Sequence, residues 1–174
     1  MTSVGATAKT LSARATKLVL LGLMALALAI GALAVWARKP GPTKLTSWPP
    51  PLTDAQARAQ LTSQCRAAAA DRRLLLIEFS APWCEHCKAV KEAVKDARVT
   101  PLLSAIRPLV LNVGEDEELN TLRLELGARA IPAWVVVEPK RCEQSPASYP
   151  RVQQTYPRGE PTELVSFLSK LGPR

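Results

Sequence analysis

Two cysteines separated by two residues, Cys84 and Cys87, stand near the middle of the chain in the segment Trp-Cys-Glu-His-Cys. The apolar run 74–79 precedes them and helix-forming residues follow, so the pair falls at a strand-to-helix turn. On the first turn of a helix, two thiols at this spacing are close enough to form a disulfide. The helix N-terminus favours Cys84 as a thiolate, which is the form that attacks disulfides. The motif therefore predicts reversible thiol–disulfide exchange.

A carboxylate lies within the apolar run that precedes the dithiol. Glu78 has apolar residues on both sides in the sequence. Burial would raise the pKa of this carboxyl, so that near neutral pH it can hold or accept a proton and act as a general acid or base for Cys87. The alternative is a side chain that points outward into solvent and takes no part in the chemistry.

The first third of the chain contains an uncharged apolar run, residues 18–37, which is long enough to cross a bilayer as a helix. Three basic residues before it favour a cytoplasmic segment 1–17: Lys9, Arg14 and Lys17. The alternative is a cleaved signal peptide, because Ala-Leu-Ala at 32–34 resembles a processing site. The run continues beyond that site, which favours an uncleaved signal-anchor. Both interpretations export the C-terminal part, to the periplasm if the protein is bacterial, or as a secreted protein after cleavage.

The net charge of +8 does not indicate nucleic-acid binding. Six of the 23 Lys and Arg residues flank the apolar run, whereas all 15 Asp and Glu residues lie beyond residue 44. The exported part is therefore close to neutral, and it has no basic cluster interleaved with aromatic residues. We attribute the excess positive charge mainly to membrane topology.

The rest of the chain alternates between helical and extended patterns. Residues 38–52 are rich in proline, which predicts a semi-rigid linker. Thr53 and Gln56 then fit a capping box, and Gly127 is placed to end a helix. Helices are predicted over 53–70, 84–98, 115–126 and 161–171, with Pro101 as an interruption, and strands over 74–79, 109–113, 134–137 and 152–156. This order predicts an α/β fold in which a mixed central sheet is flanked by helices, in a domain spanning 53–174.

These residues resemble the thioredoxin family over 53–172. The resemblance depends on a strand followed by Trp-Cys-x-x-Cys-Lys at 83–88, and on Ile131-Pro132 ahead of a later strand. It implies a thioredoxin-like fold in which Cys84 is the nucleophile and Cys87 the resolving thiol. It also implies that Pro132 is a cis-proline facing the dithiol and that Ile131 offers its backbone to an extended peptide. The alternative for this dipeptide is an ordinary turn at a strand entry.

The chain departs from thioredoxin around the dithiol. The family usually has Asp where Glu78 stands, accompanied by a Lys in the next strand, and Val110 occupies that position here. We therefore expect Glu78 to lack this partner and to stay protonated.

Three residues of the motif are expected to tune the dithiol: Trp83, Glu85 and His86. Oxidising members and isomerases of the superfamily often carry His before the second cysteine. A protonated His86 would stabilise the Cys84 thiolate, and Glu85 would oppose it, so the direction of electron flow stays open. The alternative for His86 is a solvated residue with no electrostatic role.

Two further cysteines, Cys65 and Cys142, are widely separated in sequence. A thioredoxin-like topology would allow them to approach one another and form a structural disulfide in an oxidising compartment. The alternatives are a buried Cys65 with a free Cys142, or a zinc site, although the paired spacing of structural zinc sites is absent.

The sequence thus predicts a membrane-anchored thiol–disulfide oxidoreductase that acts on extracytoplasmic protein thiols and disulfides without a cofactor. It would need a membrane or soluble redox partner. Two alternatives remain: a binding or chaperone module with this fold, and a Cu(I)-handling protein that uses the dithiol as soft ligands.

Overall fold

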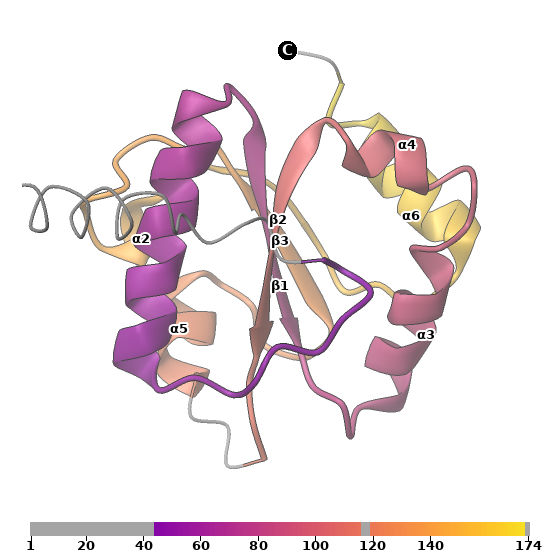
Figure 1. The fold of residues 1–174 in the computed structure, drawn as a ribbon, viewed down its shortest axis with the longest axis horizontal. Coiled ribbons are helices and arrows are strands. Elements are labelled where there is room, and N and C mark those ends of the chain that lie inside the picture. Colours follow the sequence, from indigo (N-terminus) through magenta and orange to yellow (C-terminus); the bar gives the residue numbers. More distant parts are fainter. Residues whose placement is uncertain (1–43, 116–118, 173–174) are drawn as a thin grey trace, which may run out of the picture. The chain divides into compact units, whose positions relative to one another are not determined.

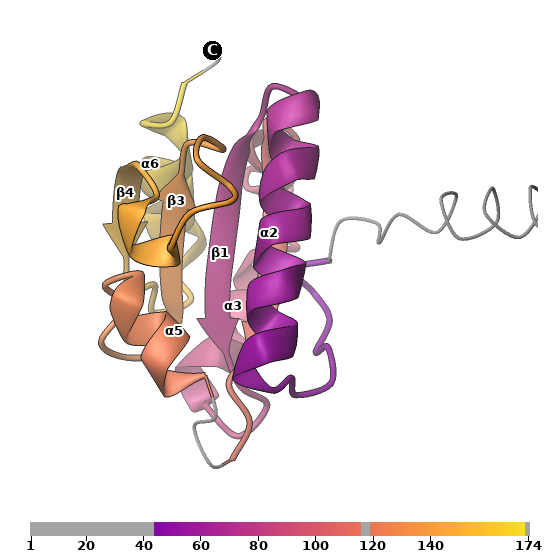
Figure 2. The ribbon, with the colours of Figure 1, turned by 90° about the vertical axis from the view of Figure 1, so that its left-hand side faces the viewer.

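A four-stranded mixed sheet forms the centre of the computed structural model, which describes residues 44–115 and 119–172. Its strands are β1 (Leu74–Ser80), β2 (Ile106–Asn112), β3 (Ala133–Val137) and β4 (Arg151–Thr155). They lie in the order β2-β1-β3-β4. β1 pairs in parallel with β2 and antiparallel with β3, and β3 pairs antiparallel with β4. Figure 2 shows β4 beside β3, on the side away from β1.

Helices cover both faces of the sheet (Figure 1). One face carries α2 (Asp54–Ala70) and α5 (Asn120–Glu125), and the other carries α3 (Glu85–Ala93), α4 (Thr100–Leu103) and α6 (Pro161–Ser169). A short 3₁₀ helix, η1 (Pro146–Ser148), precedes β4. The α/β architecture predicted from the sequence is confirmed.

The central strand β1 is buried along its whole length. Its side chains alternate between the two faces, so that Ile77 belongs to the core beneath α2 and Leu76 to the core beneath α3 and α6. Glu78 follows Leu76 by two residues and therefore lies on the face covered by α3. The strand pattern thus directs a carboxylate into an otherwise apolar layer.

Local signals explain where the first helices begin and end. The Thr53 hydroxyl accepts a hydrogen bond from the Gln56 backbone amide, and the Gln56 side chain accepts one from the Thr53 amide, which confirms the predicted capping box. The helix that follows the dithiol ends at Ala93, earlier than predicted. The Asp96 carboxylate accepts a hydrogen bond from the Arg98 amide at 2.8 Å, and such a local bond competes with continued helix.

Two prolines lie inside regular elements, whereas the sequence predicts an interruption at Pro101 and a strand that begins only at Leu109. Pro101 does not interrupt helical structure but lies in the first turn of α4, where its missing amide costs no hydrogen bond. β2 begins at Ile106 and runs through Pro108. This is tolerated because β2 is an edge strand, which leaves one row of amides without a partner strand.

The described part of the proline-rich segment, residues 44–52, packs against the domain. Leu45 is 5% exposed, and Trp48 and Leu52 pack against the core. The Pro49 carbonyl accepts a hydrogen bond from the Asn112 side chain at 2.9 Å. The boundary placed at residue 53 therefore needs correction, because these apolar side chains gain burial only by joining the domain.

Among residues 44–115 and 119–172, no helix is long and apolar enough to span a bilayer. The predicted signal-anchor helix, residues 18–37, and the cytoplasmic segment 1–17 lie outside the described residues, as do the first part of the linker and residues 116–118 of a predicted helix.

Candidate functional site

Cys84 and Cys87 are joined in a disulfide at the start of α3. Cys84 is the N-cap of this helix, and its sulfur accepts a hydrogen bond from the Cys87 amide at 3.2 Å. Cys84 is 9% exposed and Cys87 is fully buried. Of the two residues, only Cys84 therefore offers any surface to an incoming thiol or disulfide. This is the order of access that a nucleophilic and a resolving cysteine require.

Trp83 connects the dithiol turn to a neighbouring loop. Its indole nitrogen donates a hydrogen bond to the Gly114 carbonyl at 2.9 Å. The ring is nevertheless 47% exposed, which makes Trp83 one of the large apolar side chains on the surface. An exposed, anchored ring beside a reactive disulfide suits contact with a protein substrate.

The two residues between the cysteines are exposed. Glu85 forms an ion pair with Lys88 of the same helix, with 2.6 Å between Nζ and Oε1. This cation lies close to the Glu85 carboxylate, so the negative charge beside Cys84 is partly compensated. The expected effect of Glu85, which is to oppose the Cys84 thiolate, is therefore weakened by Lys88.

The peptide bond between Ile131 and Pro132 is cis, in agreement with the resemblance. The next residue, Ala133, begins β3 and pairs with Phe79 near the end of β1. Because the dithiol turn follows the same end of β1, Pro132 lies at the dithiol end of the sheet. Ile131 packs against the core cluster that contains both cysteines.

The loop leading to Ile131 is held by side chains from the end of β4. The Tyr156 hydroxyl accepts hydrogen bonds from the Arg129 amide at 2.9 Å and from the Gln154 side chain at 2.8 Å. Gln154 also donates to the Gly127 carbonyl at 3.0 Å. The sequence interpretation missed this clamp, since no motif links Tyr156 to residues so far earlier in the chain.

Glu78 is fully buried, so the solvated alternative is wrong. Desolvation raises the pKa of its carboxyl, and the nearby Lys91 ammonium opposes that rise. Lys91 Nζ lies 2.9 Å from Glu78 Oε1. Val110 stands opposite Glu78 in β2, as expected, but the inference that the acid lacks a cationic partner is wrong, because α3 supplies one. The sequence could have indicated this partner, because Lys91 stands four residues after Cys87 and therefore one helical turn further along the same helix.

Cys65 and Cys142 form a second disulfide, with 2.02 Å between the sulfurs and 5.6 Å between the Cα atoms. It joins the middle of α2 to the turn after β3. Beside it, Arg66 and Glu143 form an ion pair, and the Tyr149 hydroxyl donates to the Cys142 carbonyl at 3.1 Å. The structure thus favours the predicted pairing over a free Cys142.

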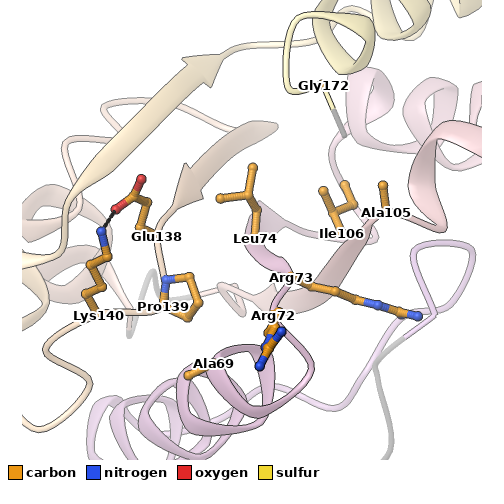
Figure 3. Close-up of a pocket in the computed structure, with 10 residues that line it drawn as sticks. All are labelled: Ala69, Arg72, Arg73, Leu74, Ala105, Ile106, Glu138, Pro139, Lys140 and Gly172. Carbon is orange, nitrogen blue, oxygen red and sulfur yellow. Dashed lines mark ion pairs between the residues drawn. The ribbon is translucent and has the colours of Figure 1, made fainter. Parts of the chain in front are cut away.

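A cavity of about 550 Å³ lies at the other end of the sheet (Figure 3). Leu74 and Ile106, the first residues of the parallel strands β1 and β2, contribute to its wall, whereas the dithiol follows the last residue of β1. Arg72, Arg73 and Lys140 also line it, and Lys140 pairs with Glu138. This cavity is separate from the dithiol. Within the described ranges, no three His, Cys, Asp or Glu side chains gather as a metal site would require.

Comparisons with known proteins agree with this geometry. Residues 56–139 match the model of a family described as thioredoxin-like. The structure is similar to a disulphide isomerase from Xylella fastidiosa Temecula1, with 20% identity over 72% of this chain and 98% of that one and a TM-score of 0.54. It is also similar to a poplar thioredoxin h, with 18% identity over 65% of this chain and 88% of that one and a TM-score of 0.50. Among curated proteins, none matches the sequence closely enough to count as a relative.

We conclude that the chain has the thioredoxin-like fold. This conclusion rests on the mixed sheet, the dithiol at the start of α3 and the cis-proline, together with the similarities to known proteins.

Proposed function

We propose that this protein is a thiol–disulfide oxidoreductase that exchanges its dithiol with disulfides of extracytoplasmic proteins. The observation that carries the proposal is the Cys84–Cys87 disulfide at the start of α3, in which Cys84 alone keeps some exposure. A fold used only for binding would not need two thiols in bonding position at a helix N-terminus.

The proposed reaction has two balanced steps. The Cys84 thiolate attacks one sulfur of a substrate disulfide, a mixed disulfide forms, and the other substrate sulfur leaves as a thiolate. Cys87 then transfers its proton to Glu78 and attacks the Cys84 sulfur, which releases the second substrate thiolate. Two electrons pass to the substrate, and the protein is left with its internal disulfide. The reverse sequence oxidises a substrate dithiol.

The substrate is proposed to bind as an extended peptide beside the cis-proline. The Ile131 backbone would pair with the peptide, and pairing through backbone groups accepts many sequences. Trp83 adds an exposed aromatic surface on the dithiol turn. Protein thiols and disulfides are therefore the substrate class that this site suits.

The extracytoplasmic location is proposed from the apolar run 18–37, which we interpret as a signal-anchor. The Cys65–Cys142 disulfide supports it, because structural disulfides persist mainly in oxidising compartments. A membrane or soluble redox partner must then regenerate the dithiol or the disulfide after each turnover.

Reduction of insulin disulfides by the full-length chain in detergent, with dithiothreitol as electron source, tests the proposal. We expect turnover that persists when a Cu(I) chelator is present. Absence of turnover together with stoichiometric Cu(I) binding would instead identify a copper-handling protein. Absence of turnover with stable client binding would identify a binding module.

Replacing Tyr156 by phenylalanine tests the clamp that holds the substrate-binding loop. The variant keeps the ring and loses the hydroxyl that accepts from the Arg129 amide. A hydrogen bond of this kind contributes about 0.5–1.5 kcal/mol, so we expect kcat/KM for insulin to fall about three- to tenfold. Reduction of the protein's own disulfide by dithiothreitol should be unchanged, because it needs no peptide docking.

Tyr149→Phe is the matched control, since the Tyr149 hydroxyl contacts Cys142 near the second disulfide. It should leave insulin reduction at the wild-type rate. An equal loss with insulin and with dithiothreitol in Tyr156→Phe would contradict a role in substrate docking.

A further inference from the structure

Lys91 is a buried lysine on α3, the helix that begins at the dithiol. It is 4% exposed, and it stands on α3 one turn after Cys87. Its ammonium lies 2.9 Å from Glu78 Oε1. A buried ammonium is costly unless it is paired, so this lysine is held in place by the carboxylate that the proposed mechanism uses as a base.

The second neighbour of this ammonium is Trp48, from the segment that precedes the first helix of the domain. Lys91 Nζ lies 4.8 Å from the centre of the indole ring, within the range of a cation–π interaction. The segment is fixed on both sides of Trp48, by the buried Leu45 and by the hydrogen bond to the Pro49 carbonyl. The ammonium is therefore enclosed between a carboxylate and an aromatic face.

Lys91 occupies one carboxylate oxygen of Glu78. The other oxygen, Oε2, is buried and makes no hydrogen bond of normal geometry, and the same holds for Ser80 Oγ and Trp134 Nε1. The Ser80 and Trp134 side chains are nevertheless close enough to the carboxylate to favour its ionised form and lower its pKa. Trp134 is the residue opposite Glu78 in β3, and Ser80 lies on the same face of β1, one step nearer the dithiol turn. Three such polar groups on one face are the surroundings that a buried water, or a proton in transit, requires.

Lys91 is the charged group that acts on Glu78 within the part of the chain that the structure describes. The residues that β2 and β3 pair with Glu78 are uncharged, and so is the α6 ring that packs against one of them. β2 places Val110 opposite Glu78, β3 places Trp134 there, and α6 contributes Phe167, whose ring lies 6.0 Å from that of Trp134. Desolvation raises the pKa of Glu78, and Lys91 is the charged group that opposes this rise, together with the uncharged Ser80 and Trp134 side chains.

We propose that Lys91, enclosed by Trp48, is a positioning residue that favours the ionised form of Glu78, the form that can take the proton of Cys87. This inference rests on the proposed function. During resolution the Cys87 thiol proton moves to Glu78, the Cys87 electron pair forms the bond to the Cys84 sulfur, and the bond from Cys84 to the substrate breaks. Lys91 keeps its proton throughout, so it contacts no reacting atom.

Through Trp48, the proline-rich segment takes part in the chemistry of the site. Trp48 belongs to the chain that connects the apolar run 18–37 to the domain, and a truncation at residue 53 would remove it together with Leu45. The segment would then be an element of the redox site rather than a passive spacer.

Two measurements on the full-length chain test this role. The first follows the Glu78 carboxyl by carbon-13 NMR as the pH is varied, and it does not depend on activity. The second measures, across the same pH range, the single-turnover rate at which Cys87 resolves a mixed disulfide formed on Cys84. Both are made on the wild type and on Lys91→Met, Lys91→Arg and Trp48→Leu. Lys95→Met is the matched control, because Lys95 follows the same helix and is exposed.

Lys91→Met should move the Glu78 titration midpoint upward by at least one pH unit, since the ionised form loses its partner. The acid limb of the resolution rate should move with it, giving at least a tenfold loss below the limb and recovery at higher pH. Trp48→Leu should shift both in the same direction by a smaller amount. Lys91→Arg should restore both, and Lys95→Met should change neither.

An unchanged Glu78 midpoint in Lys91→Met and Trp48→Leu would overturn the proposal, whatever the activity. A rate loss that is uniform across pH would overturn it too, because that is the mark of a structural role. The double variant Glu78→Gln with Lys91→Met should lose no more than Glu78→Gln alone, and an additional loss would contradict action through Glu78. If Lys91→Met does not fold, Trp48→Leu decides the matter through the shift of the Glu78 midpoint. If the wild type exchanges no thiols, the proposed function fails while the NMR titration still decides whether Lys91 controls Glu78.

Discussion

We expect Cys84→Ser to lower insulin-reducing turnover by about a thousandfold or more, because it removes the nucleophile on which the first step depends. Cys84 is the member of the dithiol that retains exposure, and it caps α3. A serine hydroxyl at this position would fill the same space but is a far poorer nucleophile near neutral pH. The initial rate of insulin precipitation under dithiothreitol measures the effect.

Two further variants test the separate roles of the cysteines. Cys87→Ser should form the mixed disulfide and fail to resolve it, so a covalent adduct should accumulate that is visible in non-reducing gels. The matched control is the double variant Cys65→Ala/Cys142→Ala, which leaves the Cys84–Cys87 pair intact and should keep turnover at temperatures where it is folded. Turnover that survives in Cys84→Ser would remove this cysteine from the mechanism.

We expect the same double variant, Cys65→Ala/Cys142→Ala, to lower the free energy of unfolding by about 4–5 kcal/mol in the chain-entropy model. The two cysteines are 77 residues apart, so the disulfide removes much of the freedom of the unfolded chain. A loss of this size is a large share of the total stability of an ordinary domain, which is about 5–15 kcal/mol. Guanidinium unfolding of the oxidised proteins measures it.

The dithiol itself supplies the matched control for this stability effect. Cys84 and Cys87 are separated by three positions in sequence, so their disulfide constrains little of the unfolded chain. Cys84→Ala/Cys87→Ala should therefore cost about 1–2 kcal/mol in the same model, less than half the cost of losing the long-range bond. Equal costs for the two double variants would show that closure of the long loop is not the source of stability.

In the proline-rich segment, the backbone and the side chains have opposite structural preferences. Prolines exclude helix and sheet, which is why the sequence predicts a spacer there. The same segment carries Leu45, Trp48 and Leu52, and these side chains find burial against the domain. The prolines indicate a separate spacer, whereas the apolar side chains favour packing against the domain. Burial of apolar surface is the stronger effect, so the segment packs against the domain.

Local sequence determined the features that depend on neighbours in the chain. The dithiol at a strand-to-helix turn, the capping box at Thr53 and the burial of β1 were all predicted, because spacing, capping and apolar runs act within a few residues. The cis bond at Pro132 and the pairing of Cys65 with Cys142 came from the resemblance to thioredoxin. Local patterns contain no information on either.

Tertiary structure alone decided which side chains meet across the fold. Lys91 reaches Glu78 because α3 packs on the face of the sheet toward which Glu78 points, and Trp48 covers Lys91 because the preceding segment folds back on α3. Tyr156 holds the loop before Ile131 because β4 ends beside the start of β3. Each of these contacts depends on the packing of one element against another, which spacing along the chain does not specify.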